Sequence, residues 1–139
     1  ENHLDDFQPV MQWKSKIIQL KLTPKGESLS YSRKYLTKKE SLIATLPIGY
    51  ADGLNRNLSN KMQVLIKGKK AAQVGNICMD MTLIDVSKIP DVKLGDDVVI
   101  FGKQGDKQIF VEELADKSNT IPYELLCNVS KRVPRIYQN

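Results

Sequence analysis

Four short stretches of the sequence bring polar, charged or aromatic residues close enough together to do chemistry. In GYADGLNR, residues 49–56, Tyr50, Asp52 and Arg56 share one stretch. An Asp-Gly pair is sufficient for a tight turn, so the tyrosine and the arginine need a second explanation. The other stretches are SYSRKY (30–35), GNICMD (75–80) and SKRVPRIY (130–137).

The histidine content narrows the chemistry that these stretches can support. The only histidine is His3, which leaves no Ser-His or Cys-His nucleophile pair and no histidine-rich metal site unless a partner supplies the missing group. Any acid–base catalysis must therefore use tyrosine, lysine or a carboxylate. Cys78 and Cys127 are too few for a four-cysteine zinc site or a disulfide scaffold, and we expect both thiols to be buried; no metal site is predicted.

Each candidate also has a purely structural interpretation. Tyr31 could be an amphipathic strand residue with a buried ring and a solvated hydroxyl. Met79 could fill the core, and Arg132 and Arg135 could form surface ion pairs. Taken one at a time, these residues do not distinguish a site from ordinary structure.

Composition predicts one soluble globular domain over residues 1–139. The chain is 41% hydrophobic and has no apolar run near the roughly 20 residues that cross a bilayer, and its N-terminus lacks a signal-peptide pattern. We therefore expect a cytoplasmic protein. The net charge of +5 allows nucleic-acid binding, but the basic runs RKYLTKKE and KGKK are short and fall at expected turns, which favours a solvated basic face.

The elements that must position these residues are mostly strands. Short strands about ten residues apart, separated by turn residues, are typical of a closed β-barrel or a sandwich. We predict a mainly β fold, a closed or partly open Greek-key-like barrel, with one or two short helices near the C-terminus. The expected strands are Trp13–Leu22, SLSYS, SLIATLPIGY, a hairpin over Lys67-Gly68, Met79–Asp85 and DDVVIFG; the expected helices are FVEELADKSN and TIPYELLCNVS, the latter with Thr120 as N-cap and Pro122 in its first turn.

Three motifs, in this order, carry a family resemblance. LPIGYADGLNR, VGNICMD and RVPRIY resemble the C-terminal domain of alanine racemase, a fold-type III enzyme that depends on pyridoxal 5'-phosphate. The resemblance runs from about Trp13 to Tyr137. It implies an isomerase that interconverts L- and D-alanine and so supplies D-alanine for peptidoglycan.

The resemblance also implies roles for individual residues. Tyr31 matches the catalytic tyrosine that exchanges the α-proton on one face of the substrate. Tyr50 matches a second tyrosine that reaches the substrate, and the backbone N–H of Met79 matches a group that holds the substrate carboxylate. Positions that match the entrance corridor are Arg56, Asp80 and Asn76. Positions that match the segment near the cofactor phosphate are Val129, Ser130 and Lys131.

Three positions depart from the family pattern. Ser32 follows the catalytic tyrosine where glycine is frequent. Lys131 stands where some members place a tyrosine that contacts the phosphate, so an ammonium would replace a phenol there. Asn76 stands where some relatives have an arginine, which implies a weaker positive charge in the corridor.

The resemblance further implies that partners complete the site. In the family, the Schiff-base lysine lies in an N-terminal (β/α)8 barrel, which we do not find in these 139 residues. Two subunits assemble head to tail, so that the barrel of one meets the tyrosine-bearing domain of the other. We expect the isolated domain to be inactive, to bind cofactor weakly, and to expose the surface around Tyr31, Tyr50 and Met79.

Two alternatives remain open at this stage. The parent enzyme could racemise serine or another small amino acid, because much of the substrate pocket would lie in the barrel. A protein of another class, a basic β-barrel that binds RNA or DNA, would use Tyr31 and Tyr35 for base stacking and would bind with a steep salt dependence.

Overall fold

The strands form where β-branched and aliphatic residues cluster between turn residues. The structure, a computed structural model, describes residues 11–30 and 35–138. The strands are β1 (Trp13–Lys16), β2 (Gln19–Thr23), β3 (Ser28–Leu29), β4 (Tyr35–Leu36), β5 (Ser41–Leu46), β6 (Gln63–Ile66), β7 (Lys69–Val74), β8 (Thr82–Asp85), β9 (Asp97–Gln104) and β10 (Lys107–Ile109). Two α-helices, α1 (Val111–Lys117) and α2 (Pro122–Asn128), and the 3-10 turns η3 (Tyr50–Asp52) and η4 (Arg56–Leu58) complete the fold.

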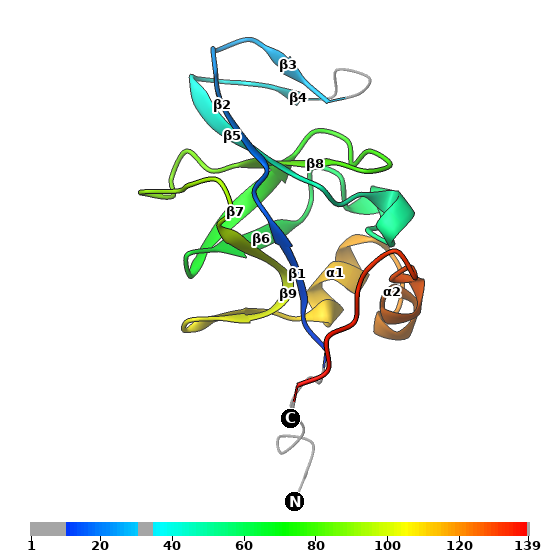
Figure 1. Cartoon of the computed structure of the whole chain (residues 1–139). Coiled ribbons are helices and arrows are strands. Elements are labelled where there is room, and N and C mark those ends of the chain that lie inside the picture. The colour runs from blue at the N-terminus through cyan, green and yellow to red at the C-terminus, as the bar shows by residue number, and fades with distance from the viewer. Residues whose placement is uncertain (1–10, 31–34, 139) are drawn as a thin grey trace, which may run out of the picture.

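The main sheet curls round on itself. Its order is β1-β9-β6-β7-β8-β5-β2, with β10 paired to β9, and all the pairs are antiparallel. The two edges, β1 and β2, belong to one stretch of chain, which changes partner at Ile17 and Ile18. The Ile17 N–H donates to the Asp96 carbonyl at 3.1 Å, and the Ile18 N–H donates to the Thr45 carbonyl at 3.0 Å. This arrangement is the partly open barrel that was predicted (Figure 1).

The barrel interior is apolar and continuous. Val64, Leu65 and Ile66 of β6 are all fully buried, and they belong to one core cluster together with residues of β9 and of both helices. The rings of Trp13 and Phe101 pack edge to face with their centroids 6.0 Å apart. Burial of such side chains is the main stabilising term of the fold.

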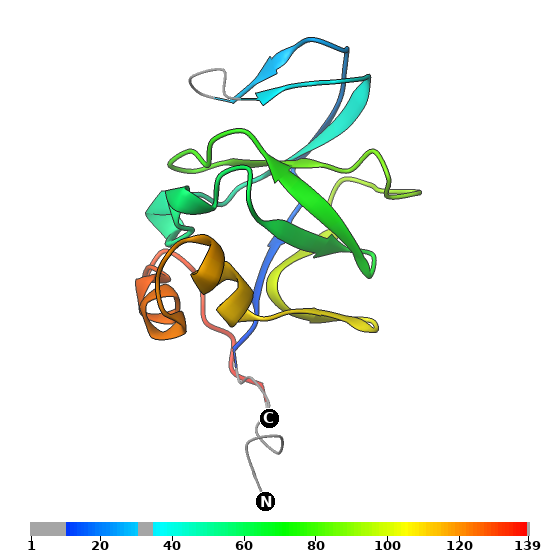
Figure 2. The ribbon, with the colours of Figure 1, turned by 180° about the vertical axis from the view of Figure 1, so that it is seen from behind.

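The two helices lie together at one end of the barrel, close to η3 and η4 (Figures 1 and 2). Leu114 and Ala115 of α1 and Leu125 of α2 point into the core. Within the described residues no helix is long and apolar enough to span a membrane. The hairpin of β3 and β4 forms a separate two-stranded sheet that projects from the opposite end.

Several boundaries differ from the predictions. The predicted strand Trp13–Leu22 is broken in two, because its halves pair with different neighbours. The predicted strand Met79–Asp85 begins only at Thr82, since the Cys78 N–H closes a turn on the Met81 carbonyl at 3.0 Å. The strand SLIATLPIGY ends at Leu46, and its last residue, Tyr50, opens η3. The hairpin over Lys67-Gly68 is confirmed.

The predicted N-cap of the second helix is wrong. Thr120 instead lies beyond the end of α1, and its N–H donates to the Ala115 carbonyl of that helix at 2.9 Å. The N-cap of α2 is Ile121, which makes no side-chain capping bond and is held extended by the following Pro122. Pro122 lies in the first turn of α2 as predicted. The expectation of buried cysteines is also wrong, because Cys78 is only partly buried and Cys127, on the outer face of α2, is exposed.

Candidate functional site

The first five residues of the GYADGLNR stretch, Gly49 to Gly53, fold into a tight turn that a carboxylate stabilises. The Asp52 side chain turns back to accept a hydrogen bond from the Gly49 N–H at 2.9 Å. Gly53 ends the turn with a left-handed φ of 108°, which favours glycine. A Cβ on Gly53 would also lie 2.2 Å from the Asn128 carbonyl oxygen, so this turn is packed against the end of α2.

Backbone hydrogen bonds join this turn to the GNICMD stretch. The Tyr50 N–H donates to the Cys78 carbonyl and the Ala51 N–H donates to the Met79 carbonyl, both at 3.0 Å. The approach is so close that a Cβ on Gly49 would lie 2.1 Å from the Cys78 carbonyl oxygen. Tyr50 and Met79, which sequence reasoning predicted as substrate-binding residues, are therefore held on neighbouring segments.

The surface that these residues form is open. Tyr50 is 47% exposed and Met79 52% exposed, and Met81 beside them is also half exposed. The structural alternative of Met79 as a core residue is therefore wrong, and the expectation of an open surface is confirmed for Tyr50 and Met79. Among the hydrogen bonds of the described residues, the Met79 carbonyl is used and the Met79 N–H is not.

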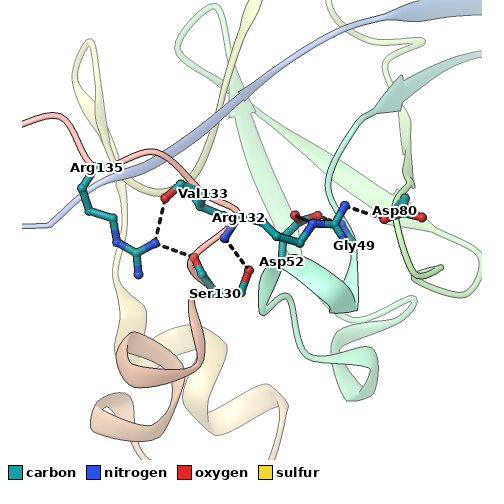
Figure 3. A network of polar contacts seen from close by, with 7 residues as sticks. All are labelled: Gly49, Asp52, Asp80, Ser130, Arg132, Val133 and Arg135. Carbon is teal, nitrogen blue, oxygen red and sulfur yellow. Dashed lines mark hydrogen bonds and ion pairs between the residues drawn. The ribbon is translucent and has the colours of Figure 1, made fainter.

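An arginine from the C-terminal stretch links the two segments. Arg132 donates from Nη2 to Asp80 Oδ1 at 2.7 Å, and its Nε lies 3.4 Å from Asp52 Oδ1 (Figure 3). The Asp52 side chain is only 11% exposed, whereas Arg132 and Asp80 are about half exposed. The hydrogen bond to Asp80, and then the charge of Asp52, raise the pKa of Arg132.

A second arginine fixes the backbone from which Arg132 projects. Arg135 donates to the carbonyls of Val129 and Val133, each at 2.7 Å, and to that of Ser130. The Ser130 N–H in turn donates to the Asp52 carbonyl at 2.9 Å, and the Ser130 hydroxyl accepts from the Arg132 N–H. Figure 3 shows how these contacts place the C-terminal stretch against the turn.

The three predicted corridor residues do not share one environment. Arg56 and Asp80 are exposed, whereas Asn76 is only 6% exposed. Ser59 connects the segments of Arg56 and Asn76, since its hydroxyl donates to the Arg56 carbonyl at 2.7 Å and accepts from the Ile77 N–H at 2.9 Å.

A buried glutamine, absent from the sequence prediction, supports the same region. Gln73 is 2% exposed, and its amide donates to the carbonyls of Val74 and Gly75. Its oxygen accepts from the Asn60 N–H at 2.7 Å, and the Asn60 side chain accepts from the Gly75 N–H at 2.6 Å. A glutamine within an alternating strand gives no sequence signal for such a role.

Tyr31, the predicted catalytic residue, lies outside the described residues. The residue before it, Ser30, has a left-handed φ of 70° and donates from its hydroxyl to the Asn76 carbonyl at 3.0 Å. The end of β3 is thereby fastened to the GNICMD stretch.

Tyr35, the other tyrosine of SYSRKY, has the wrong environment for a base. It packs against the small cluster of Leu29, Ile43 and Val74. Desolvation and then the charge of Asp85 raise the pKa of Tyr35, so its phenolate is disfavoured.

The segment Val129–Lys131 offers one side chain suited to a phosphate. Val129 is buried, and both the N–H and the hydroxyl of Ser130 already have protein partners. Lys131 is exposed and forms no ion pair within the described part of the chain, so its positively charged ammonium is accessible to a phosphate. The donor set therefore fits a cofactor phosphate through Lys131. No group of three or more potential metal-ligating side chains occurs among residues 11–30 and 35–138.

Comparison with known proteins identifies the family. The family model described as "Alanine racemase, C-terminal domain" matches residues 10–137. The chain belongs to this family. Alanine racemase 2 of Caldanaerobacter subterraneus subsp. tengcongensis is 52% identical over 98% of this chain, and the alanine racemase of Halothermothrix orenii is 51% identical over 96%.

Solved structures of the family have the same fold. The alanine racemase from Bacillus anthracis with bound L-Ala-P superposes with a TM-score of 0.86 at 41% identity over 92% of this chain. The alanine racemase of Clostridium difficile 630 in complex with cycloserine gives a TM-score of 0.83 at 44% identity over 91%. This alanine racemase C-terminal domain spans about a third of the length of these relatives, 35% of the two sequences and 32% of the two structures.

Proposed function

We propose that this domain belongs to a pyridoxal 5'-phosphate-dependent racemase that interconverts L- and D-alanine. One observation carries the proposal. Backbone hydrogen bonds from Tyr50 and Ala51 to the carbonyls of Cys78 and Met79 hold the exposed Tyr50 next to Met79, and the Met79 N–H makes no hydrogen bond within the described residues. An N–H and a phenol on adjacent segments suit a small substrate with a carboxylate.

Tyr31 would be the acid–base group. Racemisation removes the Cα proton from one face and returns a proton to the other, so the Tyr31 phenolate oxygen would take or return the proton on its own face. Because a free phenol has a pKa of about 10, nearby positive charge worth about 3–4 kcal/mol is needed to lower it by 2–3 units. We expect the rest of the protein to supply this charge and the acid on the opposite face.

The cofactor would be held partly by the C-terminal stretch. Lys131, with Val129 and Ser130 shaping the backbone beside it, would contact the phosphate. When bound, the cofactor supplies an electron sink for the deprotonated Cα. Arg56, Asp80 and Asn76 would line or support the corridor by which alanine enters.

The open surface would be completed by other domains. Half-exposed Tyr50, Met79 and Met81 form a patch of the kind that an interface covers. We propose that it meets an N-terminal barrel in a head-to-tail homodimer, in the cytoplasm, where the product D-alanine serves peptidoglycan synthesis. The isolated domain would then show no turnover and weak cofactor binding, which absorbance titration with pyridoxal 5'-phosphate would test.

The decisive experiment compares two tyrosines in the longer enzyme that contains this domain. Exchange of the alanine α-proton for deuterium would fall by about 10²–10⁴-fold in Tyr31→Phe, the range typical of a lost general acid–base group. Tyr35→Phe, the matched control from the same SYSRKY stretch, would stay within about twofold. Equal rates for Tyr31→Phe and the unmodified enzyme would refute the assignment, and a higher kcat/KM for serine than for alanine would correct the substrate.

A further inference from the structure

We infer that Arg132 is a positioning residue for substrate binding, which rests on the function proposed above. Its guanidinium contacts two carboxylates, one on each segment of the site. Asp52 lies two positions after Tyr50, and Asp80 directly follows Met79. One cation therefore controls the relative placement of the phenol and the Met79 backbone.

The contacts on the Tyr50 side form a short, fully occupied chain. One oxygen of Asp52 faces Arg132 Nε at 3.4 Å, and the other accepts from the Gly49 N–H at 2.9 Å. The Asp52 carbonyl accepts from the Ser130 N–H, so the C-terminal stretch binds this residue through both side chain and backbone. Movement of the guanidinium would thus move Asp52 and, through it, Gly49, the first residue of the turn that presents Tyr50.

The contact on the Met79 side acts on the residue that follows the N–H proposed to hold the substrate. Asp80 shares its peptide with Met79, and its carboxylate is held at 2.7 Å by Arg132 Nη2. The Met79 carbonyl is fixed by the Ala51 N–H. On the other side of the Met79 α-carbon, the Cys78 carbonyl, which shares its peptide bond with the Met79 N–H, accepts from the Tyr50 N–H at 3.0 Å. The chain is therefore restrained on both sides of Met79, and these restraints limit rotation of the Met79 N–H.

The geometry favours positioning over stability as the role of this arginine. Arg132 and Asp80 are 55% and 53% exposed, and an ion pair with that exposure adds little to the free energy of unfolding. Asp52 is less exposed, but its hydrogen bond from the Gly49 N–H does not depend on Arg132. A planar guanidinium can address two carboxylates from Nε and Nη2 at once, whereas an ammonium offers one charged centre. The distinguishing consequence is a change in substrate binding without a matching loss of fold.

The test uses the longer racemase that contains this domain, with Arg132→Met, Arg132→Lys and a control, Lys16→Met. Lys16 makes an exposed ion pair with Asp97 at 3.3 Å on β1 and β9, outside the site. We expect KM for alanine to rise about tenfold in Arg132→Met and about threefold in Arg132→Lys, with kcat within about threefold, because an interaction present in both ground and transition states affects KM. Lys16→Met should leave both parameters unchanged.

A second readout does not depend on turnover. Amide hydrogen exchange in the peptide containing Tyr50 and Ala51 should accelerate about tenfold in Arg132→Met and remain unchanged in β9. The inference would be overturned if amide exchange in this peptide is unchanged. It would also be overturned if KM stays constant and kcat falls only in proportion to the fraction of protein that is unfolded. If the unmodified enzyme racemises no amino acid, the proposed function fails, and the exchange measurement alone decides whether Arg132 couples the two segments.

Discussion

The barrel and the site are held together by different forces. In the barrel, backbone pairing such as that of β6 with β9 is backed by side chains that are wholly withdrawn from water, among them Leu65 and Ile100. The site segments meet through backbone hydrogen bonds and one arginine between two carboxylates. Apolar burial is strong but not directional, whereas hydrogen bonds are weaker in net terms and fix orientation.

This difference suggests a division of labour. Substitutions in the barrel should lower the free energy of unfolding and leave the geometry of the site intact in the molecules that remain folded. Substitutions between the site segments should change the geometry of the site even where they lower the free energy of unfolding only slightly.

The largest effect on stability is expected from the barrel. Leu65→Ala removes a fully buried side chain of β6 and should cost about 2–5 kcal/mol in unfolding free energy. Urea unfolding measures this loss, and KM for alanine in the longer enzyme should stay within about twofold below the transition. A tenfold change in KM in fully folded protein would show that the barrel also sets the geometry of the site.

Gly49→Ala tests the closest approach between the site segments. The new Cβ would lie 2.1 Å from the Cys78 carbonyl oxygen and 2.5 Å from that of Met79, so the segments must separate. We expect a loss of about 1–3 kcal/mol from this overpacking and a fall in kcat/KM of at least tenfold. The control is Gly95→Ala, where no atom lies within 4 Å of the added Cβ and only the left-handed φ of 86° is strained. Equal activities of the two variants would contradict the division of labour.

Gln73→Leu, a substitution in strand β7, should lower the free energy of unfolding by a smaller amount. It removes donors from the Val74 and Gly75 carbonyls and an acceptor from the Asn60 N–H, at a cost of about 1 kcal/mol. Gln63→Leu on β6, at an exposed position, is the control and should change unfolding by less than about 0.5 kcal/mol. If both variants unfold at the same urea concentration, the buried amide is not a structural link.

The fold could be predicted where periodicity is local. The hairpin over Lys67-Gly68 and strand β9 follow from alternating or continuous apolar residues next to glycine. The break between β1 and β2 could not be predicted, because one apolar run pairs with two different strands and nothing local distinguishes its halves. Thr120 failed as an N-cap because the proline after Ile121 decides where α2 begins.

The site could be predicted only in part, and mainly through family resemblance. Tyr50 and Met79 were found in motifs, whereas the pairing of Arg132 with Asp52 and Asp80 joins residues far apart in the sequence. Ion pairs between residues so far apart follow no periodic spacing in the sequence, so the sequence alone does not predict them. Asp52 was interpreted as a turn residue alone, although its carboxylate both closes the turn and faces Arg132.

The smallest effect is expected at Tyr35, where it sharpens the contrast with the proposed base. Desolvation and the charge of Asp85 raise its pKa above the ordinary value, so the neutral phenol is favoured in the folded state. This contribution to stability is fully present below about pH 10, where the unfolded phenol ionises, and is lost as pH rises through the folded pKa. Spectrophotometric titration at 295 nm should therefore lose a component that titrates above the ordinary tyrosine pKa in Tyr35→Phe, with unfolding at neutral pH nearly unchanged. Loss of an early component instead would mean that Tyr35 has an environment suited to a base and would reopen the choice between the two tyrosines.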